Sequence, residues 1–318
     1  MGRGRVVARK SYNRDQSPLY RVTSPSMLAK RLHVSVAQLH GLLANDDNYI
    51  RWTDKDSGRP IQQPKPFLRA IHERVAKLLA RIETPDYLHS AVKGRSYITN
   101  ANCHCPHTPT VKIDVKKFYP SARAQAVFHF FRDRMGCDGD VAGILAALLT
   151  VDGHLPTGSS ASPILSYFAY EDMFGAIAEA ARQRGCVMTC YVDDMVFTGP
   201  GATPRLIHEV RRIAQPYRLW THKTMVFGPG EPKVITGLAI TVDGPRVPNR
   251  RKRIVKQALR SFRRDPAGVS VAALRRLVGQ LHEAAQIDPT WKPSALWAGM
   301  QLRLKQVADA ASGGSTKG

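Results

Sequence analysis

The chain has 318 residues, 43% of them hydrophobic, so it can bury the core of one large domain or of two to three closely packed subdomains. It has 47 lysines and arginines against 25 aspartates and glutamates, a formal net charge of +22, which makes a polyanion the expected partner because each neutralised phosphate releases condensed counterions. No apolar run approaches the ~20 residues of a membrane-spanning helix, which argues against an integral membrane protein, whereas charge alone leaves a ribosomal-type or membrane-surface binder open.

The N-terminal part begins with a polar, basic stretch, residues 1–18, that we expect to be loose. Leucine spacing predicts two short helices between Ser24 and Ala44, broken near Val34, with Ser35 as an N-cap. Such a pair is either a packing unit or a helix-turn-helix that grips DNA.

Further along the chain, helical and alternating hydrophobic patterns succeed one another. This mixture indicates an α+β protein. In chain order we expect a strand–turn–strand at 49–63, a helix from Pro66 to Ile82, a strand at 111–115, helices at 124–134, 141–151 and 162–184, a strand–turn–strand at 186–198, a helix at 204–214 and a strand at 234–242.

The composition changes after Pro245. Residues 246–310 hold 14 lysines and arginines against 4 aspartates and glutamates, a net charge of +10. Two helices are predicted there, capped by Ser270 and Ser294. The apolar face of the second consists of Leu296, Trp297, Met300, Leu304 and Val307. The Gly- and Ser-rich end, residues 312–318, is expected to be disordered.

Two adjacent carboxylates, Asp193 and Asp194, stand between two short apolar runs, which places them at the tip of a predicted hairpin. Like charges at this separation repel each other, and divalent cations would remove that penalty. By itself the motif is equally compatible with an ordinary surface turn, because aspartate favours turns.

A third carboxylate, Asp114, ends the strand predicted at 111–115. Beside the hairpin tip it would complete an oxygen-rich site for two Mg²⁺ ions. Two such ions stabilise the attacking and leaving oxygens of an in-line phosphoryl displacement, a reaction that depends mainly on positioning and charge neutralisation.

A Gly- and Ser-rich loop, Gly153 to Pro163, leads into a predicted helix. Its backbone N–H groups and the positive end of the helix dipole could receive a template base or a triphosphate. The loop alone is a weak signal. The order of carboxylate, loop, paired carboxylates and then Lys223 is far more specific.

In this order the motifs resemble those of reverse transcriptases, over residues 20–310. The matching stretches are Asp114 with Phe118-Tyr119, Leu155-Pro156-Thr157-Gly158-Ser159 with Ser162-Pro163, Tyr191-Val192-Asp193-Asp194, and His222-Lys223-Thr224. Three further stretches resemble bacterial retron reverse transcriptases: Asn100-Ala101-Asn102-Cys103-His104, Ile235-Thr236-Gly237 (with Ile for the usual Val) and Val278-Gly279-Gln280-Leu281. Thr157 and Val192 stand where the wider family often has Gln and retrons often have Ala.

The resemblance implies a right-hand polymerase fold with an antiparallel palm sheet flanked by helices. Fingers would occupy residues 1–110, the palm 111–240 and a basic helical thumb 241–318. It also implies two Mg²⁺ ions, for which Mn²⁺ is an alternative. The implied metal ligands are Asp114, Val115, Asp193 and Asp194.

Substrate contacts are implied in the same way. Tyr119 would be a steric gate that rejects a 2′-hydroxyl, although without the motif it would be taken for a core aromatic. Lys223 would assist the triphosphate as a general acid or charge clamp. The implied dNTP contacts are Tyr119, Arg95, Lys223, Thr157 and Gly158. The implied RNA contacts are Asn100, His104, Thr236, Gly237, Arg250, Arg251, Lys252 and Arg253.

The implied partners are dNTPs and a dedicated non-coding RNA that serves as template and as primer through an internal 2′-hydroxyl. The product would be msDNA, a branched RNA–DNA hybrid, used in anti-phage defence with an effector or toxin protein. The odd number of cysteines and the lack of an apolar stretch after the basic N-terminus favour a cytoplasmic location.

Three alternatives stay open. The chain could be a group II intron-type or other defence-associated reverse transcriptase, although residues 241–318 leave little room for a maturase, endonuclease or ribonuclease H domain. It could be a catalytically silent RNA-binding scaffold, against which the three carboxylates and Lys223 argue. Finally, Cys103, His104, Cys105 and His107 could bind zinc, although no second Cys pair stands at a zinc-ribbon distance.

Overall fold

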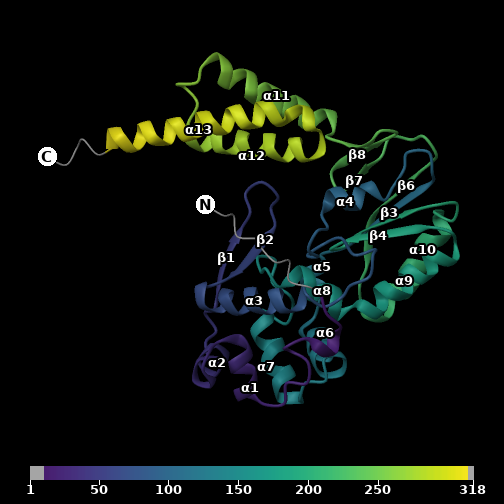
Figure 1. Cartoon of the computed structure of the whole chain (residues 1–318). Coiled ribbons are helices and arrows are strands. Elements are labelled where there is room, and N and C mark those ends of the chain that lie inside the picture. Colours follow the sequence, from purple (N-terminus) through teal and green to yellow (C-terminus); the bar gives the residue numbers. More distant parts are fainter. Residues whose placement is uncertain (1–10, 314–318) are drawn as a thin grey trace. The chain divides into compact units, whose positions relative to one another are not determined.

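The computed structural model describes residues 11–313 and comprises two compact units (Figure 1). The N-terminal unit contains residues 11–103 and 107–229, and the C-terminal unit contains 104–106 and 230–313. The predictions of a loose N-terminus (1–18) and a disordered tail (312–318) lie outside the described residues at 1–10 and 314–318, whereas residues 312 and 313 are helical, contrary to the second prediction. Residues 11–18 contradict the first of them, because Tyr12 pairs with Ile82 and η1 (Arg14–Gln16) follows.

A four-stranded antiparallel sheet forms the centre of the N-terminal unit, with strand order β4-β5-β3-β6. Its strands are β3 (Thr110–Val115), β4 (Val187–Tyr191), β5 (Asp194–Thr198) and β6 (Thr221–Phe227). The first three were predicted from their apolar, β-branched runs. The polar strand β6 was not predicted.

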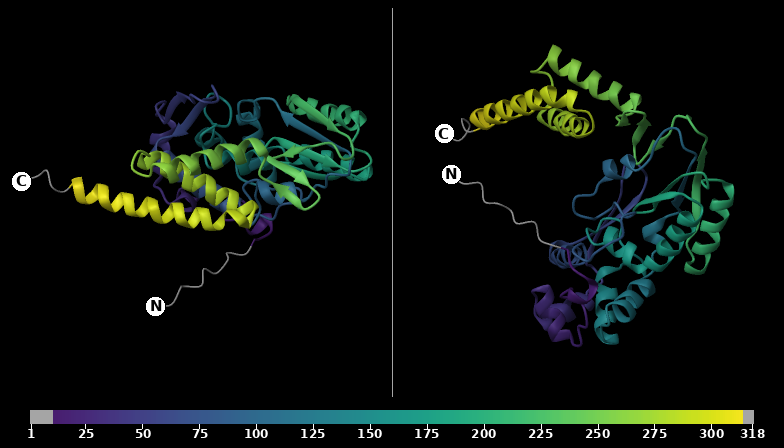
Figure 2. Two further views of the ribbon diagram at one scale, coloured as in Figure 1. Left: turned by 90° about the horizontal axis from the view of Figure 1, so that it is seen from above. Right: turned by 45° about the vertical axis from the view of Figure 1, so that its right-hand side comes forward.

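Two helices lie together against this sheet, α9 (Glu171–Gln183) and α10 (Pro204–Ala214), as Figures 1 and 2 show. The α10 helix is strongly amphipathic: Leu206, Ile207 and Val210 are buried. Pro204 at its first turn supplies the fixed φ that suits a helix start. The predicted bounds of α10 are confirmed.

The remaining helices of the N-terminal unit, except α4, bury apolar side chains in one core with the sheet. They are α1 (Pro25–Leu32), α2 (Val36–Leu43), α3 (Pro66–Leu79), α4 (Tyr97–Asn102), α5 (Phe118–Ser121), α6 (Ala124–His129), α7 (Gly139–Leu149), α8 (Ser162–Ala169) and η3 (Gln215–Tyr217). Ser35 caps α2 through a capping box, as predicted. The leucines of α1 and α2 are largely buried, which favours the packing unit over a DNA-gripping pair.

Four predicted helices differ in extent. The helix predicted at 141–151 begins and ends two residues earlier, as α7. The helix that begins at Pro66 ends at Leu79, and Ile82 is buried beyond it. The helix predicted at 124–134 changes into a π-turn, η2 (Phe130–Arg134). The helix predicted at 162–184 is interrupted at Tyr170, because the backbone leaves helical geometry there.

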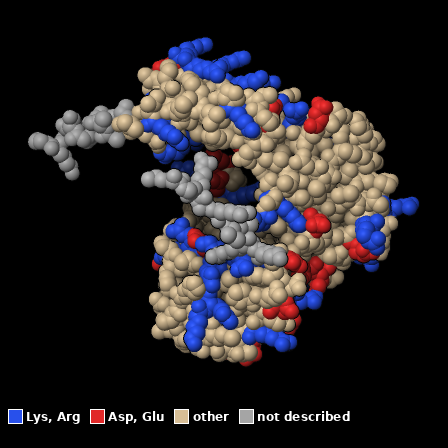
Figure 3. All heavy atoms as spheres, viewed as in Figure 1, with Lys and Arg blue, Asp and Glu red and all other residues tan. Residues whose placement is uncertain are grey.

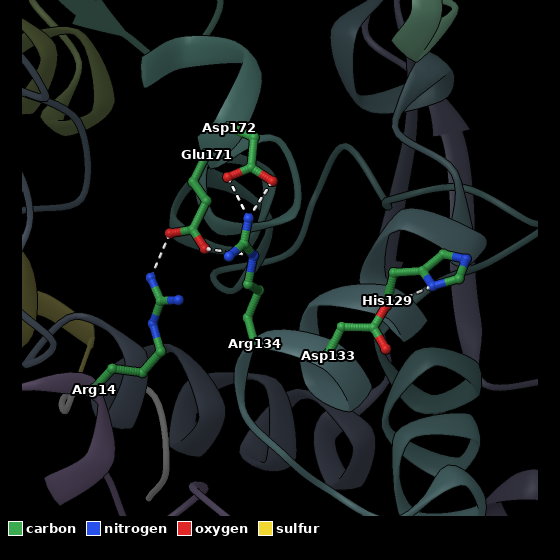
Figure 4. A network of polar contacts seen from close by, with 6 residues as sticks. All are labelled: Arg14, His129, Asp133, Arg134, Glu171 and Asp172. Atoms are coloured by element: carbon green, nitrogen blue, oxygen red, sulfur yellow. Dashed lines mark hydrogen bonds and ion pairs between the residues drawn. The ribbon is translucent and has the colours of Figure 1, made fainter. Parts of the chain in front are cut away.

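Ion pairs tie the N-terminal segment and the π-turn to the start of α9 (Figure 4). Arg14 pairs with Glu171, and Arg134 pairs with both Glu171 and Asp172. Burial raises the pKa of Glu171, and the two arginines oppose that shift. These contacts hold in place a segment that the sequence indicated as loose.

The C-terminal unit combines a three-stranded antiparallel sheet with three long helices. Its elements are β7 (Val234–Ile235), β8 (Leu238–Thr241), β9 (Gly244–Arg246), α11 (Asn249–Arg264), α12 (Val271–Ile287), η4 (Pro289–Trp291) and α13 (Lys292–Gly313). The strand predicted at 234–242 is a hairpin instead. It turns at Thr236 and Gly237, both with positive φ, which suits a two-residue hairpin turn.

The helices of this unit pack around Phe262, Leu274 and Leu281. Ser270 caps α12, as predicted. The prediction that Ser294 caps the last helix was wrong, because α13 already begins at Lys292. The predicted apolar face of α13 is also not its packed face. Trp297 packs against Phe262, but Leu296, Met300, Leu304 and Val307 are exposed.

None of the helices in the described chain combines the length and apolarity needed to cross a membrane.

Candidate active site

Backbone pairing brings the three aspartates to one end of the sheet. Asp114 on β3 stands directly opposite Asp194 on β5. Asp193 lies in the two-residue turn between β4 and β5, and the Val115 N–H donates to its carbonyl oxygen over 3.3 Å. Three acidic side chains that are far apart in the sequence are thus neighbours in the fold.

Strained backbone surrounds these carboxylates. Val192, Lys117 and Lys223 all have positive φ (62°, 48° and 47°), a region that side chains with a Cβ rarely adopt. The Val192 N–H donates to Ser90 Oγ over 3.0 Å, which helps to fix the turn that carries Asp193. Such strain concentrates at functional sites, where the surrounding fold imposes it.

Each aspartate faces a basic group. Asp114 Oδ1 lies 2.6 Å from His222 Nε2 on β6, and Asp194 Oδ2 lies 2.8 Å from Lys112 Nζ on β3. Arg59, at the end of the turn between β1 (Tyr49–Thr53) and β2 (Pro60–Pro64), interacts electrostatically with Asp193. The other oxygen of Asp194, Oδ1, is buried and has no hydrogen-bond partner among the described residues.

Burial and mutual repulsion govern the ionisation of this cluster. Burial, followed by the charge of Asp114, raises the pKa of Asp193 to about 6, while Arg59 opposes the shift. Burial also raises the pKa of Asp194, and Lys112 opposes that rise. The protein therefore holds negative charge here at a cost that a nearby cation would offset.

The side-chain oxygens themselves are not gathered into a ligand cluster. Within residues 11–313, no three His, Cys, Asp or Glu side chains are arranged so that they could hold a metal ion together, and this range includes the segment from Cys103 to His107. Asp114 and Asp194 are instead turned to His222 and Lys112. The backbones of the three aspartates therefore come together as expected, whereas the carboxylate oxygens of Asp114 and Asp194 face basic side chains.

Comparison with known families decides the assignment. Residues 48–223, more than half of the chain, match the family described as reverse transcriptase (RNA-dependent DNA polymerase). The chain belongs to the reverse transcriptase family.

Several curated relatives are retron enzymes. The chain is 26% identical to the retron Mx162 reverse transcriptase of Myxococcus xanthus, over 85% of this chain and 65% of that protein. It is 25% identical to the retron Ec86 reverse transcriptase of Escherichia coli, over 67% of this chain and 70% of that protein. The retron Se72 reverse transcriptase of Salmonella heidelberg is 28% identical over 44% of this chain and 37% of its own length. The chain thus spans less than two thirds of the length of the Mx162 and Se72 proteins.

Tyr119 interacts electrostatically with Asp193, and Lys223 follows His222, the partner of Asp114, on β6. The pKa of Tyr119 is raised by burial and by the charge of Asp193, so its ring lies close to the hairpin tip. Lys223 is exposed on β6, next to His222. The pairing of β6 with β3 shifts register at this point, and such a bulge re-aims a side chain beside an active site.

The two loop residues that were predicted to contact the dNTP, Thr157 and Gly158, are hydrogen-bonded to β2. Thr157 Oγ1 accepts from Gln62 N over 3.1 Å and donates to Pro60 O over 2.9 Å, and Gly158 N donates to Gln62 O over 3.0 Å. A Cβ at Gly158 would meet Gln62 O at 2.9 Å, so only glycine allows this approach. The loop thus docks against β2, which uses the Gly158 N–H that we expected to be open to a triphosphate.

Arg95, another predicted dNTP contact, is also bound by groups within the protein. Its guanidinium donates to the carbonyl oxygens of Pro85 and Leu88 and pairs with Asp86 at 2.9 Å. These contacts organise its own loop before α4 and leave few donors for a triphosphate.

The residues predicted to contact RNA differ in their burial and contacts. Asn100 is fully buried in α4, and its side-chain nitrogen and oxygen have no hydrogen-bond partner among the described residues; His104 is also buried. Thr236 and Gly237 form the β7–β8 turn. Arg251 contacts Gly237 O and pairs with Glu283, so it braces this unit. Its neighbours Arg250 and Arg253 are exposed.

Sequence reasoning did not single out three basic residues of this candidate site: Lys112, His222 and Arg59. Lys112 precedes Asp114 by two positions and so shares its face of β3, a signal that the sequence did contain. His222 was visible only as a member of a motif. Arg59 follows a predicted turn, and nothing in its neighbourhood pointed to Asp193.

Proposed function

We propose that this chain is an RNA-directed DNA polymerase that copies a dedicated, structured non-coding RNA into DNA. The observation that carries the proposal is the meeting of Asp114, Asp193 and Asp194 at one end of the sheet, in a chain of the reverse transcriptase family. The names of the retron relatives support the choice of a retron-type enzyme.

Two divalent ions, Mg²⁺ or alternatively Mn²⁺, are the proposed cofactors. The donor set fits them, because carboxylates are hard oxygen ligands and Asp194 Oδ1 is buried without a partner among the described residues. Asp114, Asp193, Asp194 and the Val115 carbonyl would hold the ions. Bound there, they would stabilise the attacking and leaving oxygens of nucleotidyl transfer.

The chain's own residues would place the nucleotide. Tyr119, half-buried beside Asp193, would lie under the sugar and leave no room for a 2′-hydroxyl. Lys223, exposed at the β6 bulge, would neutralise the triphosphate or protonate the leaving group. Arg59, which is exposed and electrostatically coupled to Asp193, is a better placed triphosphate ligand than Arg95.

The RNA partner would serve as template and also as primer, through an internal 2′-hydroxyl, and the product would be branched msDNA. We extend the proposal to a role in anti-phage defence with an effector protein, on the strength of the retron relatives alone. The exposed basic residues of α11, among them Arg250 and Arg253, would contact the RNA–DNA duplex.

Primer extension tests the proposal. Purified protein with Mg²⁺, dNTPs and a primed RNA template should synthesise DNA, and chelation of the metal should stop it. Asp193→Asn should abolish synthesis and leave RNA affinity within roughly threefold, because charge on the basic surface is unchanged. RNA binding without any extension by the unaltered protein would instead favour a silent scaffold.

A further inference from the structure

A second basic feature of the N-terminal unit lies on α10, which is labelled in Figure 1. There a pocket of about 380 Å³ opens between the outer face of the helix and the segment that enters β6. It is lined by His208, Arg211, Arg212, Gln215 and Trp220, together with the buried Leu219. None of these residues has a role in the proposed reaction.

The fold holds Trp220 outward in a fixed place. Leu219 is buried, and in extended chain the next residue points to the opposite side. The Trp220 carbonyl accepts from the Lys116 N–H over 2.7 Å, so its backbone is anchored to the palm. Its side chain is nevertheless 62% exposed, the largest exposed fraction among the tryptophans of the described chain. An exposed aromatic ring on an anchored backbone is a ready stacking platform.

The charges around the ring have one sign. Arg211 donates to Thr221 Oγ1 over 3.1 Å and to Thr224 Oγ1 over 3.4 Å, which fixes its guanidinium while further N–H groups remain available. The side chains of Arg212 and His208 make no hydrogen bond or ion pair with the described residues, and the lining contains no carboxylate. The nearest acid on the helix, Glu209, is paired with Arg184 at 2.7 Å.

An indole ring beside two arginines combines the two recognition elements of a nucleotide, a surface for the base and donors for the phosphate. Most of the lining residues are exposed, so the pocket is an open groove that a polymer can cross. Gln215 adds an amide that can bind a base edge or a 2′-hydroxyl.

We propose that this groove binds an unpaired nucleotide of the RNA partner, with its base stacked on Trp220 and its phosphate held by Arg211 and Arg212. The inference rests on the proposed function for the existence of an RNA partner. It places an RNA contact on the palm helix α10, in addition to the basic residues of the C-terminal unit.

Photocrosslinking tests the site directly. A single-stranded RNA oligonucleotide containing 4-thiouridine is irradiated with the full-length protein without dNTPs, and the crosslinked peptide is identified by mass spectrometry. We expect a crosslink within residues 208–221. Trp220→Ala should remove it and weaken binding of this RNA about 5- to 150-fold, because stacking on one aromatic contributes about 1–3 kcal/mol.

Two variants separate stacking from general charge. Trp220→Phe keeps an aromatic face and should restore the crosslink. Arg212→Ala should weaken binding and reduce the salt dependence of RNA affinity by about one phosphate contact. Arg205→Ala removes an exposed charge from the same helix outside the pocket and should leave the crosslink unchanged.

The site would be overturned by the absence of crosslinks at 208–221, by unaltered RNA affinity in Trp220→Ala, or by tighter binding of the matching DNA oligonucleotide. The assay needs no catalysis and can be repeated with Asp193→Asn. A failure of the polymerase proposal would appear as a lack of primer extension, and a failure of the groove would appear only in crosslinking and affinity.

Discussion

At the scale of single residues, Lys112 occupies an unusual position for a basic side chain. It stands on the same face of β3 as Asp114 and pairs at 2.8 Å with Asp194, and both side chains are about four-fifths buried. A cation in this position neutralises part of the acidic cluster by itself. Any ion held by Asp194 must compete with it.

Replacing Lys112 by Met should therefore make the protein depend more on divalent ions. Without them, Asp194 loses its partner, and the melting temperature should fall by about 3–10 °C, since loss of a partly buried partner costs about 1–3 kcal/mol. Added Mg²⁺ should raise the melting temperature more in Lys112→Met than in the unaltered protein. Differential scanning fluorimetry measures both shifts. A variant as stable as the parent without metal would contradict this role.

Tyr119 provides a second prediction for a single residue. Tyr119→Ala should raise incorporation of ribonucleotides relative to deoxyribonucleotides at least about tenfold, because rejecting one hydroxyl by sterics involves roughly 1–3 kcal/mol. Tyr119→Phe keeps the ring and serves as the control. Single-nucleotide insertion kinetics supply the ratio, and an unchanged ratio in Tyr119→Ala would remove Tyr119 as the gate.

The sequence predicted that Asp114, Asp193 and Asp194 come together, and the pairing of β3 with β5 brings their backbones to one end of the sheet. It did not identify Lys112 or His222 as their partners. His222 meets Asp114 only because β6 pairs with β3 across a register shift, and pairing between distant strands leaves no local pattern. Arg95, by contrast, was assigned from its place near a motif, and its donors are used by its own loop.

At the scale of elements, one buried histidine links α3, α7 and the Gly- and Ser-rich loop, which were predicted separately. His72 on α3 contacts Leu148 O at the end of α7 through Nε2 over 2.8 Å, and Ser159 Oγ through Nδ1 over 2.6 Å. The Leu148 carbonyl can only accept, so Nε2 carries the proton and Nδ1 accepts from the serine hydroxyl. Burial lowers the pKa of His72 to about 4.

This shift predicts a loss of stability in mild acid. Below about pH 6.5 the unfolded chain takes up a proton on this histidine, whereas the folded protein does so only near pH 4, so stability falls as the pH drops through this window. Between pH 7 and pH 5 the contribution is about 2 kcal/mol. Urea denaturation of His72→Gln should show a weaker pH dependence by about this amount. Equal pH dependence in the two proteins would contradict the assignment.

Helix periodicity identified most helices, but it did not show which helix faces are covered. The apolar stripe of α13 was read correctly as a stripe, but Leu296, Met300 and Leu304 are exposed, because periodicity reveals a face and not what covers it. Likewise β6 escaped prediction because its Thr-His-Lys-Thr start is polar and a bulge interrupts its alternation.

At the scale of the whole molecule, we expect the distribution of positive charge to govern the binding of RNA. Lysine and arginine side chains gather over α11 on the face shown in Figure 3. There they line a groove of about 650 Å³ that contains no carboxylate. The lining residues are Asn249, Lys252, Arg253, Lys256, Gln257 and Arg260. Such a surface binds phosphates largely by counterion release.

RNA affinity should therefore fall steeply with salt. Replacing both Lys256 and Arg260 by Ala should weaken binding and reduce the slope of log affinity against log salt by roughly 1.4–1.8, about 0.7–0.9 per lost phosphate contact. Lys30→Ala, an exposed charge on α1, serves as the control and should leave the slope unchanged. Fluorescence anisotropy across a salt series gives the slopes, and a flat response would argue against phosphate contacts at α11.

The proposed reaction depends most on Asp114, Asp193 and Asp194 acting together on divalent ions. Electron paramagnetic resonance of Mn²⁺, with a primed RNA template and a non-hydrolysable dNTP, counts those ions directly. We predict two bound Mn²⁺ per chain, and the loss of at least one in both Asp114→Asn and Asp193→Asn. The same number of bound ions in the unaltered protein and in both variants would contradict the account.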